Sequence, residues 1–299
     1  MKIEHWQLKQ RQAEPLDVKI LMSKERIKQW YNHWDGEVYV AFSGGLDSTV
    51  LLHMVRSIYP DVPAVFNNTG VEFPEIVKFV RGTENVVWGR PRKRFHRVVH
   101  EYGYPVVSKR IAQYVHEVQH SRGETATKRL RLTGIKTDGT YTALGRISKK
   151  WLFLCDAPFG VSDRCCFWLK KDPSKRIEKE YGRGILGIRA DESKQREQNY
   201  LMHKCNAYDF KRPRSWPLAF WMHQDIWDYI HLHNIPYSPI YDMGYSSTGC
   251  FPCMFGVHME DYPNRFQRMY DTHPKLWVYC MNKLGIQQVL DYIGIESKP

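Results

Sequence analysis

The 299-residue sequence contains no apolar run that approaches the roughly 20 residues required by a membrane-spanning helix. Its first residues also lack the apolar core of a signal peptide. We therefore expect a soluble, cytoplasmic protein with no membrane partner. A chain of this length can bury a full core, either as one large α/β domain or as one domain with a smaller appended part.

Acidic residues are in the minority. The sequence has 44 Lys and Arg against 32 Asp and Glu, which leaves a net charge of +12. An excess of this size suits an acidic partner such as a nucleotide or the backbone of a nucleic acid. A merely basic surface is the alternative.

Cysteines are few and odd in number. Seven are present in a chain that has no secretion signal, so a disulfide framework is disfavoured. A metal or redox role for some of them is the better interpretation. The sequence does not indicate the oligomeric state.

The common nucleoside-triphosphate loop, G-x-x-x-x-G-K-[ST], is absent. In its place, residues 38–52 have the pattern of a buried strand, a glycine turn and the opening of a helix. Gly44 and Gly45 can adopt unusual backbone angles, and the helix behind them presents unpaired N–H groups. These features predict a phosphate-binding turn. An ordinary strand-to-helix turn is the alternative.

Strands and helices alternate through the first half of the chain, which predicts an α/β fold with a parallel twisted sheet flanked by helices. A later apolar run ends at Arg189 and fits a buried strand that delivers this arginine to the ligand edge of the sheet. The predicted helices cover residues 16–34, 49–57 and 92–102, and the predicted strands cover 63–67, 85–88 and 184–189. In the first helix, the expected apolar face consists of Ile20, Leu21, Ile27, Trp30 and Trp34.

Residues 119–150 are polar and basic, and they include the run Lys128-Arg129-Leu130-Arg131. We interpret this segment as a helical excursion or a mobile insertion. Its charges form either a solvated face or a contact surface for nucleic acid.

Four cysteines form an adjacent pair, Cys165 and Cys166, and a C-x-x-C motif, Cys250 to Cys253. Four thiolates can hold zinc or an iron–sulfur cluster, and C-x-x-C alone does not distinguish the two. Adjacent side chains diverge on a regular strand, but on a helix or kinked turn they can reach adjacent irons. Four thiols that merely pack are the third interpretation. The other three cysteines, at positions 155, 205 and 280, are expected to be packed or surface thiols.

Residues 43–49 resemble the SGGxDS loop of the ATP pyrophosphatase (PP-loop, adenine nucleotide alpha hydrolase) superfamily. Its members bind ATP and cleave it between the α and β phosphates to adenylate a substrate. The resemblance implies that Asp47 helps to seat Mg²⁺. It also implies that the pyrophosphate is held by Ser43, Gly44, Gly45, Leu46, Ser48 and Thr49.

Two further segments resemble the sulfonucleotide reductases and their ATP-cleaving relatives. Residues 68–75 resemble the D-T-G-x-x-F-P-E segment, which implies nucleotide binding by Thr69 and Gly70, although Asn68 stands where the acid is usual. Residues 189–196 resemble the R-x-[DE]-x-S-x-x-R segment, which implies anion binding by Arg189.

The cysteine pattern and the run over residues 216–250 resemble the adenylyl-sulfate reductases within the phosphoadenylyl-sulfate (PAPS) reductase family. This resemblance implies a [4Fe-4S] cluster on Cys165, Cys166, Cys250 and Cys253, with zinc as the alternative. It also places Lys170 near the cluster and the substrate. The resemblance covers residues 36–255. Residues 1–35 are then an N-terminal helical segment, and 256–299 a C-terminal helical extension.

Reductases of this family attack the substrate sulfur with a cysteine in a C-terminal E-C-G-[LI]-H motif, and residues 291–299 hold no such cysteine. An intact loop together with a cluster instead resembles the branch that contains DndC-like DNA phosphorothioation proteins and phage proteins. This resemblance implies an ATP-cleaving, adenylating enzyme that transfers sulfur from an unidentified donor to a nucleotide or nucleic acid. The alternatives are an adenylyl-sulfate or phosphoadenylyl-sulfate reductase, and a nucleic-acid-binding protein with a vestigial nucleotide fold and structural zinc.

Overall fold

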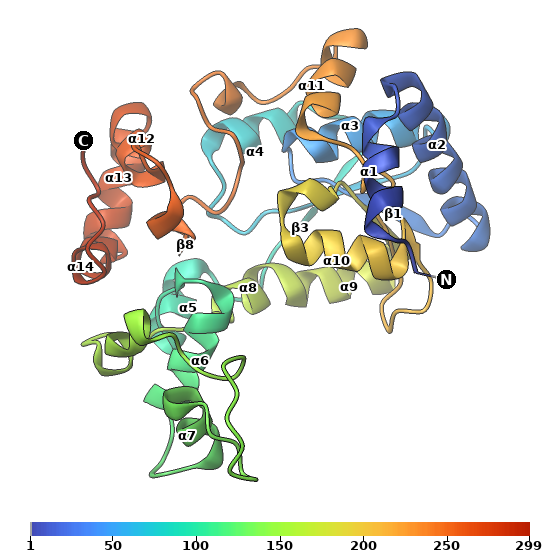
Figure 1. The fold of residues 1–299 in the computed structure, drawn as a ribbon. Coiled ribbons are helices and arrows are strands. Elements are labelled where there is room, and N and C mark those ends of the chain that lie inside the picture. The colour runs from blue at the N-terminus through green and yellow to red at the C-terminus, as the bar shows by residue number, and fades with distance from the viewer. Residues whose placement is uncertain (1) are drawn as a thin grey trace. The chain divides into compact units, whose positions relative to one another are not determined.

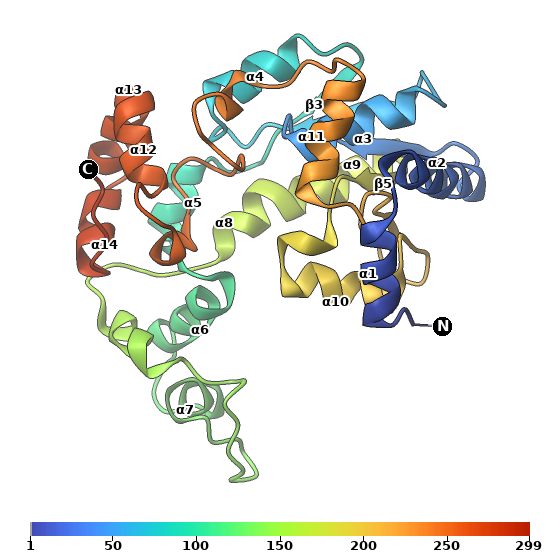
Figure 2. The same ribbon diagram turned by 45° about the horizontal axis from the view of Figure 1, so that its top comes forward.

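The computed structural model describes residues 2–299, and the chain forms two compact units (Figures 1 and 2). Each unit is assembled from segments that are distant in the sequence. The first unit contains residues 2–68, 72–90 and 173–248, and the second contains 69–71, 91–172 and 249–299.

A six-stranded sheet forms the centre of the first unit, in the order β3-β2-β1-β5-β7-β6. Val40 on β1 lies opposite Ala64 on β2 and Ile185 on β5, and both pairings are parallel. Only the edge strand β6 is antiparallel to its neighbour, among the pairings of this sheet in residues 2–299. The strands are β1 (Val38–Ala41), β2 (Ala64–Asn67), β3 (Val86–Gly89), β5 (Arg183–Leu186), β6 (Asn206–Ala207) and β7 (Arg214–Ser215). The predicted parallel α/β sheet is confirmed.

The strand order reverses between β1 and β5. From β1 the chain proceeds to β2 and β3 on one side, and it returns to add β5 on the other side. Ligands of open α/β sheets bind at the carboxyl ends of the strands next to such a reversal. The turn at Ser43 follows β1 and Arg189 follows β5, so both predicted ligand segments begin at this position.

Helices flank this sheet, with α3 and α11 on the opposite side from α9 and α10 (Figure 1). On α3, Val50, Leu51 and Met54 are fully buried. The helices of this unit are α1 (His5–Ala13), α2 (Leu16–His33), α3 (Leu46–Arg56), α4 (Pro74–Arg81), α9 (Asp172–Tyr181, which begins at the last residue of the second unit), α10 (Lys194–His203) and α11 (His223–Leu232).

The apolar face predicted for α2 is partly wrong, although its bounds agree closely with the prediction. Leu21 is 68% exposed, whereas Lys19 is 3% exposed. The Lys19 ammonium can be buried because it lies 2.7 Å from the carboxylate of Asp225 in α11. This ion pair compensates for the loss of hydration. That carboxylate also accepts the N–H of Met222 at the start of α11, so the pair joins two helices.

The second unit is mostly helical, as predicted for the C-terminal part. Its one ladder among residues 2–299 pairs β4 (Val106–Val107) with β8 (Met254–Phe255) in parallel. Its principal helices are α5 (Phe95–Tyr102), α6 (Lys109–Gln119), α7 (Ala126–Thr133), α8 (Arg164–Cys166), α12 (Arg265–Thr272), α13 (Pro274–Val278) and α14 (Ile286–Tyr292). Over residues 2–299, no helix combines the length and the hydropathy that crossing a membrane would require.

Candidate active site

The turn between β1 and α3 depends on two glycines. Gly44 has a φ of +74°, and a Cβ there would lie 2.9 Å from the Val80 side chain and 3.0 Å from that of Ile76 on α4. A side chain would thus meet both backbone strain and a steric clash. Gly45 is the N-cap of α3, so the first N–H groups of an 11-residue helix open into the turn.

Hydroxyl groups fix the shape of this turn. The Ser43 N–H donates to Ser48 Oγ over 3.1 Å, and the Gly45 N–H donates to Ser43 Oγ over 3.3 Å. Ser48 Oγ and Thr49 Oγ1 both donate to the Gly45 carbonyl, at 2.9 and 3.0 Å. Ser48 and Thr49 therefore hold the loop in its cradle conformation, in addition to the phosphate-binding role implied by the resemblance.

Tyr241 is a residue of this site that sequence reasoning did not identify. Its hydroxyl accepts the Leu46 N–H over 3.0 Å, and it lies 3.5 Å from Thr248 Oγ1. A Cβ on Gly45 would lie 3.0 Å from Thr248 Oγ1 and 3.2 Å from the Tyr241 hydroxyl. Burial raises the pKa of Tyr241, so it stays a neutral hydroxyl. The hydroxyl thus accepts the hydrogen bond of the first N–H group of α3, a group that could otherwise bind an anion.

Asp47 and Arg189, both predicted site residues, are in contact. Arg189 Nε lies 2.5 Å from Asp47 Oδ1, and Arg189 Nη1 lies 2.9 Å from Asp191 Oδ2. Gly187 permits this approach, because a Cβ there would lie 2.8 Å from the Asp47 carbonyl group. The end of β5 can therefore pack against the first turn of α3, and the guanidinium reaches the carboxylate.

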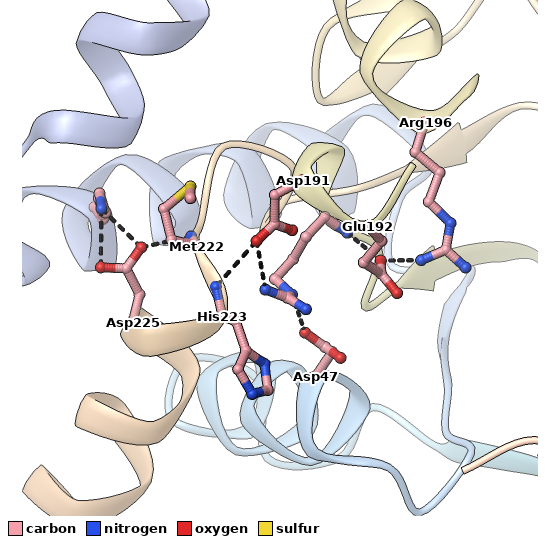
Figure 3. A network of polar contacts seen from close by, with 9 residues as sticks. Asp47, Asp191, Glu192, Arg196, Met222, His223 and Asp225 are labelled. Atoms are coloured by element: carbon pink, nitrogen blue, oxygen red, sulfur yellow. Dashed lines mark hydrogen bonds and ion pairs between the residues drawn. The ribbon is translucent and has the colours of Figure 1, made fainter. Parts of the chain in front are cut away.

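The surroundings of this ion pair are largely buried. Arg189 is 6% exposed. Burial raises the pKa of Asp191, against the lowering effects of Arg189 and of the His223 N–H, which donates to Asp191 over 3.1 Å. Figure 3 shows Asp47, Asp191 and His223 around this contact.

Asp47 Oδ1 and Arg189 Nε are close, but their angles do not form a hydrogen bond, and neither atom has another hydrogen-bond partner among residues 2–299. Buried polar atoms in this condition are costly unless a ligand pairs with them. A carboxylate and a guanidinium at the mouth of a phosphate cradle are the groups that a metal ion and a phosphate would engage. The residues present thus fit Mg²⁺ and a polyphosphate.

The four predicted ligand cysteines all belong to the second unit. Cys165 and Cys166 lie on α8, before a π-helical turn over Phe167–Lys171. The pKa of Cys165 is raised by its hydrogen bond with Cys166, by burial, and by the charges of Cys166, Cys253 and Cys250. Cys165 is therefore close enough to each of the other three thiols to interact with it electrostatically.

Positive charge accompanies these thiols. The hydrogen bond with Cys165 lowers the pKa of Cys166, and the ammonium groups of Lys109 and Lys170 lower it further, while burial opposes them. Lys170 thus lies near Cys166 and Cys253. Over residues 2–299, no three His, Cys, Asp or Glu side chains converge as a metal-ion site. The cysteines therefore do not converge as a metal site in this geometry, although four sulfur donors beside two cations are the residue types that a thiolate-ligated group uses.

Thr69 and Gly70 also belong to the second unit. Thr69 is buried, and its Oγ1 accepts the Val71 N–H over 3.3 Å. The Val71 carbonyl accepts the N–H of Phe251, which lies inside the C-x-x-C motif. Gly70 has a φ of +79° with open space where a Cβ would stand. The segment that follows β2 is therefore hydrogen-bonded to the loop of the C-x-x-C motif.

The remaining cysteines are unactivated thiols. Burial raises the pKa of Cys205 and of Cys280 to about 12, and that of Cys155 to about 11. Cys205 and Cys280 are buried, and Cys155 is half-buried. All three remain protonated and poorly nucleophilic at neutral pH.

The fold and the turn define an α/β protein with a glycine turn and a helix N-terminus at the strand reversal, an arrangement that suits a phosphate group. The profile of the phosphoadenosine phosphosulfate reductase domain matches residues 37–128 and 109–255. The chain belongs to this family, whose members are enzymes of sulfur metabolism.

Individual relatives are distant. An adenosine 5'-phosphosulfate reductase of Anoxybacillus flavithermus is 23% identical over 258 residues, which cover 86% of this chain and 90% of that protein. An uncharacterized protein of Methanocaldococcus jannaschii is 28% identical over 263 residues, covering 86% of this chain and 43% of that protein. The crystal structure of a PAPS reductase from Candida auris has a TM-score of 0.46 and 16% identity, over 84% of this chain and 97% of that one.

Proposed function

We propose that this member of the family cleaves ATP between its α and β phosphates and adenylates an acceptor, in a pathway of sulfur transfer to a nucleotide or nucleic acid. The observation that carries the proposal is the intact cradle over Ser43–Thr49 beside the contact between Asp47 and Arg189. A cradle with a helix N-terminus, a carboxylate and a buried guanidinium suits a polyphosphate better than a single sulfate.

In the proposed reaction, a nucleophilic oxygen of the acceptor attacks the α-phosphorus. The bond between the α-phosphorus and the bridging oxygen breaks, and its electron pair leaves with pyrophosphate. The N–H groups of Gly44, Gly45 and Leu46 would hold that leaving group, for which it must replace the Tyr241 hydroxyl at Leu46. Arg189 would stabilise charge on the transferring phosphoryl group. Mg²⁺, held with the help of Asp47, would neutralise charge on the phosphate oxygens.

The cysteine group is assigned to a [4Fe-4S] cluster, with Cys165, Cys166, Cys250 and Cys253 as its ligands. Sulfur-only donors, their mutual interaction and the neighbouring Lys109 and Lys170 support this assignment over packed thiols. A bound cluster would supply a polarising or redox centre, and Lys170 would add positive charge beside it.

A second candidate, reduction of an adenylyl sulfate, is favoured by the names of the relatives. Such a reductase needs an accessible thiolate outside the ligand group. The raised pKa values of Cys155, Cys205 and Cys280 argue against these three as that nucleophile. We therefore rank ATP cleavage first.

The deciding experiment measures anaerobic pyrophosphate release from ATP with DNA or tRNA as acceptor. We expect release that is lost in Asp47→Ala and kept in Asp228→Ala, whose carboxylate lies on the exposed side of α11. Equal turnover in Asp47→Ala would contradict the mechanism. Sulfite release from adenylyl sulfate with a thiol donor and without ATP would instead support the reductase.

A further inference from the structure

Residues 121–150, here called the basic arm, are the most positively charged part of the second unit. They contain eight Lys and Arg against the two acids Glu124 and Asp138, so half of the net charge of +12 lies in a tenth of the sequence. The arm includes α7, and α7 has no buried residue. It therefore presents charge to solvent rather than apolar surface to a core.

The arm is nevertheless held in a defined shape. Arg131 Nε lies 2.6 Å from Glu117 on α6, and Arg131 Nη1 donates to the Gly145 carbonyl over 3.0 Å. The same guanidinium stands 3.7 Å from the ring centroid of Tyr114. Ile147 is fully buried, and its N–H donates to the Arg131 carbonyl. Arg131, on α7, thus anchors the arm to α6. Figure 2 shows α6 and α7 next to each other.

Beyond α7 the chain forms a hairpin that displays an aromatic ring. The Thr142 N–H donates to the Gly134 carbonyl over 2.8 Å, and the Lys136 N–H donates to the Thr140 carbonyl over 2.9 Å. Tyr141 is 61% exposed on this hairpin. Its hydroxyl accepts a hydrogen bond from Arg146 over 3.3 Å, and its ring lies so close to Gly134 that a Cβ there would stand 2.8 Å from it.

Several cations of the arm are not used in its own structure. The side chains of Arg122, Lys136 and Lys149 are exposed, and within the described chain they form no hydrogen bond or ion pair. Lys128, by contrast, is paired with Glu124 at 3.0 Å. These three cations and the exposed ring of Tyr141 give one arm both of the groups that a polyanion with planar groups would contact.

We propose that the basic arm binds single-stranded nucleic acid, with Arg122, Lys136 and Lys149 at phosphates and a base stacked on Tyr141. Charge complementarity selects a polyphosphate backbone, and stacking needs a base face that a duplex does not expose. A solvated charged face would account for the lysines, but it gives no reason for a largely exposed aromatic ring on the same arm. Only the connection of this binding to catalysis rests on the proposed function.

The test uses the full chain and fluorescence anisotropy with a labelled oligothymidylate, over a range of salt concentrations. In the triple variant Arg122→Gln, Lys136→Gln and Lys149→Gln, the slope of log K against log salt should fall by about 2, at about 0.7 for each phosphate that is no longer neutralised. A matched control changes Lys2, Lys9 and Lys28 of the first unit to Gln and should leave this slope unaltered.

Tyr141→Ala separates stacking from charge. We expect the affinity for oligothymidylate to fall roughly five-fold or more, with the salt slope unchanged. Binding by the triple variant that equals the control would overturn the proposal. Tighter binding to a duplex of matched length, or to phosphatidylglycerol vesicles, would overturn it as well.

The outcome for the arm can be told apart from that for ATP cleavage. Asp47→Ala should bind oligothymidylate normally, and the triple variant should retain any pyrophosphate release that occurs without nucleic acid. Full turnover in Asp47→Ala would contradict the proposed function and leave the arm proposal intact. Normal oligonucleotide binding by the triple variant would contradict the arm proposal and leave the proposed function intact.

Discussion

Arg189 Nε lies 2.5 Å from Asp47 Oδ1, and this contact joins the end of β5 to the first turn of α3. β1, which precedes α3, and β5 are neighbours at the reversal of the strand order. In this structure each charge has the other as its partner of opposite sign. If the proposed function holds, Mg²⁺ would offer the carboxylate, and phosphates would offer the guanidinium, a new partner of opposite charge.

Removing the guanidinium should therefore affect turnover. We expect Arg189→Gln to lower kcat for pyrophosphate release by about 10²-fold, since the transferring phosphoryl group loses a preorganised donor. Arg189→Lys should recover only part of the loss, because an ammonium cannot replace a two-pronged guanidinium. Steady-state kinetics measure both, with Lys28→Gln on the exposed side of α2 as the control. Unchanged kcat in Arg189→Gln would exclude this role.

Tyr241→Phe tests whether the tyrosine hydroxyl occupies an anion position. Without ligand, the Leu46 N–H loses its acceptor, and we expect a destabilisation of about 1 kcal/mol. Pyrophosphate should restore that acceptor, so its stabilisation of the variant should exceed that of the parent protein. Thermal unfolding with and without pyrophosphate measures this difference. Tyr237→Phe, whose hydroxyl is bonded to Asp242, is the matched control. Equal ligand-induced shifts in both variants would argue against the interpretation.

Gly44→Ala should be costly for two reasons that can be separated. Gly44 and Gly139 share a positive φ, +74° and +81°, but only at Gly44 would a Cβ meet neighbours. We expect Gly44→Ala to destabilise the protein by about 1–3 kcal/mol more than Gly139→Ala, which is the cost of overpacking. Urea unfolding midpoints of the two variants provide the comparison. Similar midpoints would mean that α4 yields to the methyl group.

Cys166→Ser and Cys253→Ser test the assignment of the cluster. Anaerobically purified parent protein should contain iron and acid-labile sulfide and absorb visible light, and both variants should lose these properties because a thiolate ligand is missing. Cys155→Ser, a half-buried thiol of the same unit, should retain them. Stoichiometric zinc without visible absorbance would favour the zinc alternative, and iron retained by both serine variants would contradict the ligand set.

Stability should fall at alkaline pH because of Tyr39 on β1. Burial, followed by the Glu178 carboxylate, raises the pKa of Tyr39 from 10.0 to about 12. The folded chain keeps this proton while the unfolded chain releases it, so the contribution is complete below pH 10 and is lost as the pH rises toward 12. A tenfold difference in proton affinity between the two states corresponds to about 1.4 kcal/mol. The unfolding free energy of Tyr39→Phe should depend less on pH in this range than that of the parent protein. The exposed Tyr262 is the control, and Tyr262→Phe should show the same pH dependence as the parent.

Local patterns in the sequence were sufficient for the strand, turn and helix around Ser43 and for the placement of Arg189 at a strand end. Both follow from hydrophobic runs and glycines that act over a few residues. The contact of Tyr241 with Leu46 could not be predicted in this way, because it joins residues 195 positions apart. A turn motif alone contains no information on a distant hydroxyl.

The face of α2 shows a different limit. Apolar periodicity favoured Leu21, but the packed row contains Lys19, Ser23, Ile27 and Trp30. Lys19 enters this row through its ion pair with Asp225, and Ser23 through its hydrogen bonds with the Pro217 carbonyl and with Trp221. Polar residues with buried partners are invisible to a hydrophobic count, since the partner lies elsewhere in the chain.

The chain passes between its two units at five positions, after residues 68, 71, 90, 172 and 248. No continuous gene fragment can therefore encode either unit alone. Truncated chains, two-hybrid baits or isolated domains cut at a single boundary would each expose an unfinished core. Each unit also has to bring together segments that are distant in the sequence, and every such step costs loop-closure entropy. Refolding should therefore be slow, and it should be sensitive to protein concentration because incomplete cores aggregate. Insertions for tagging or labelling are best placed in exposed turns away from these five connections.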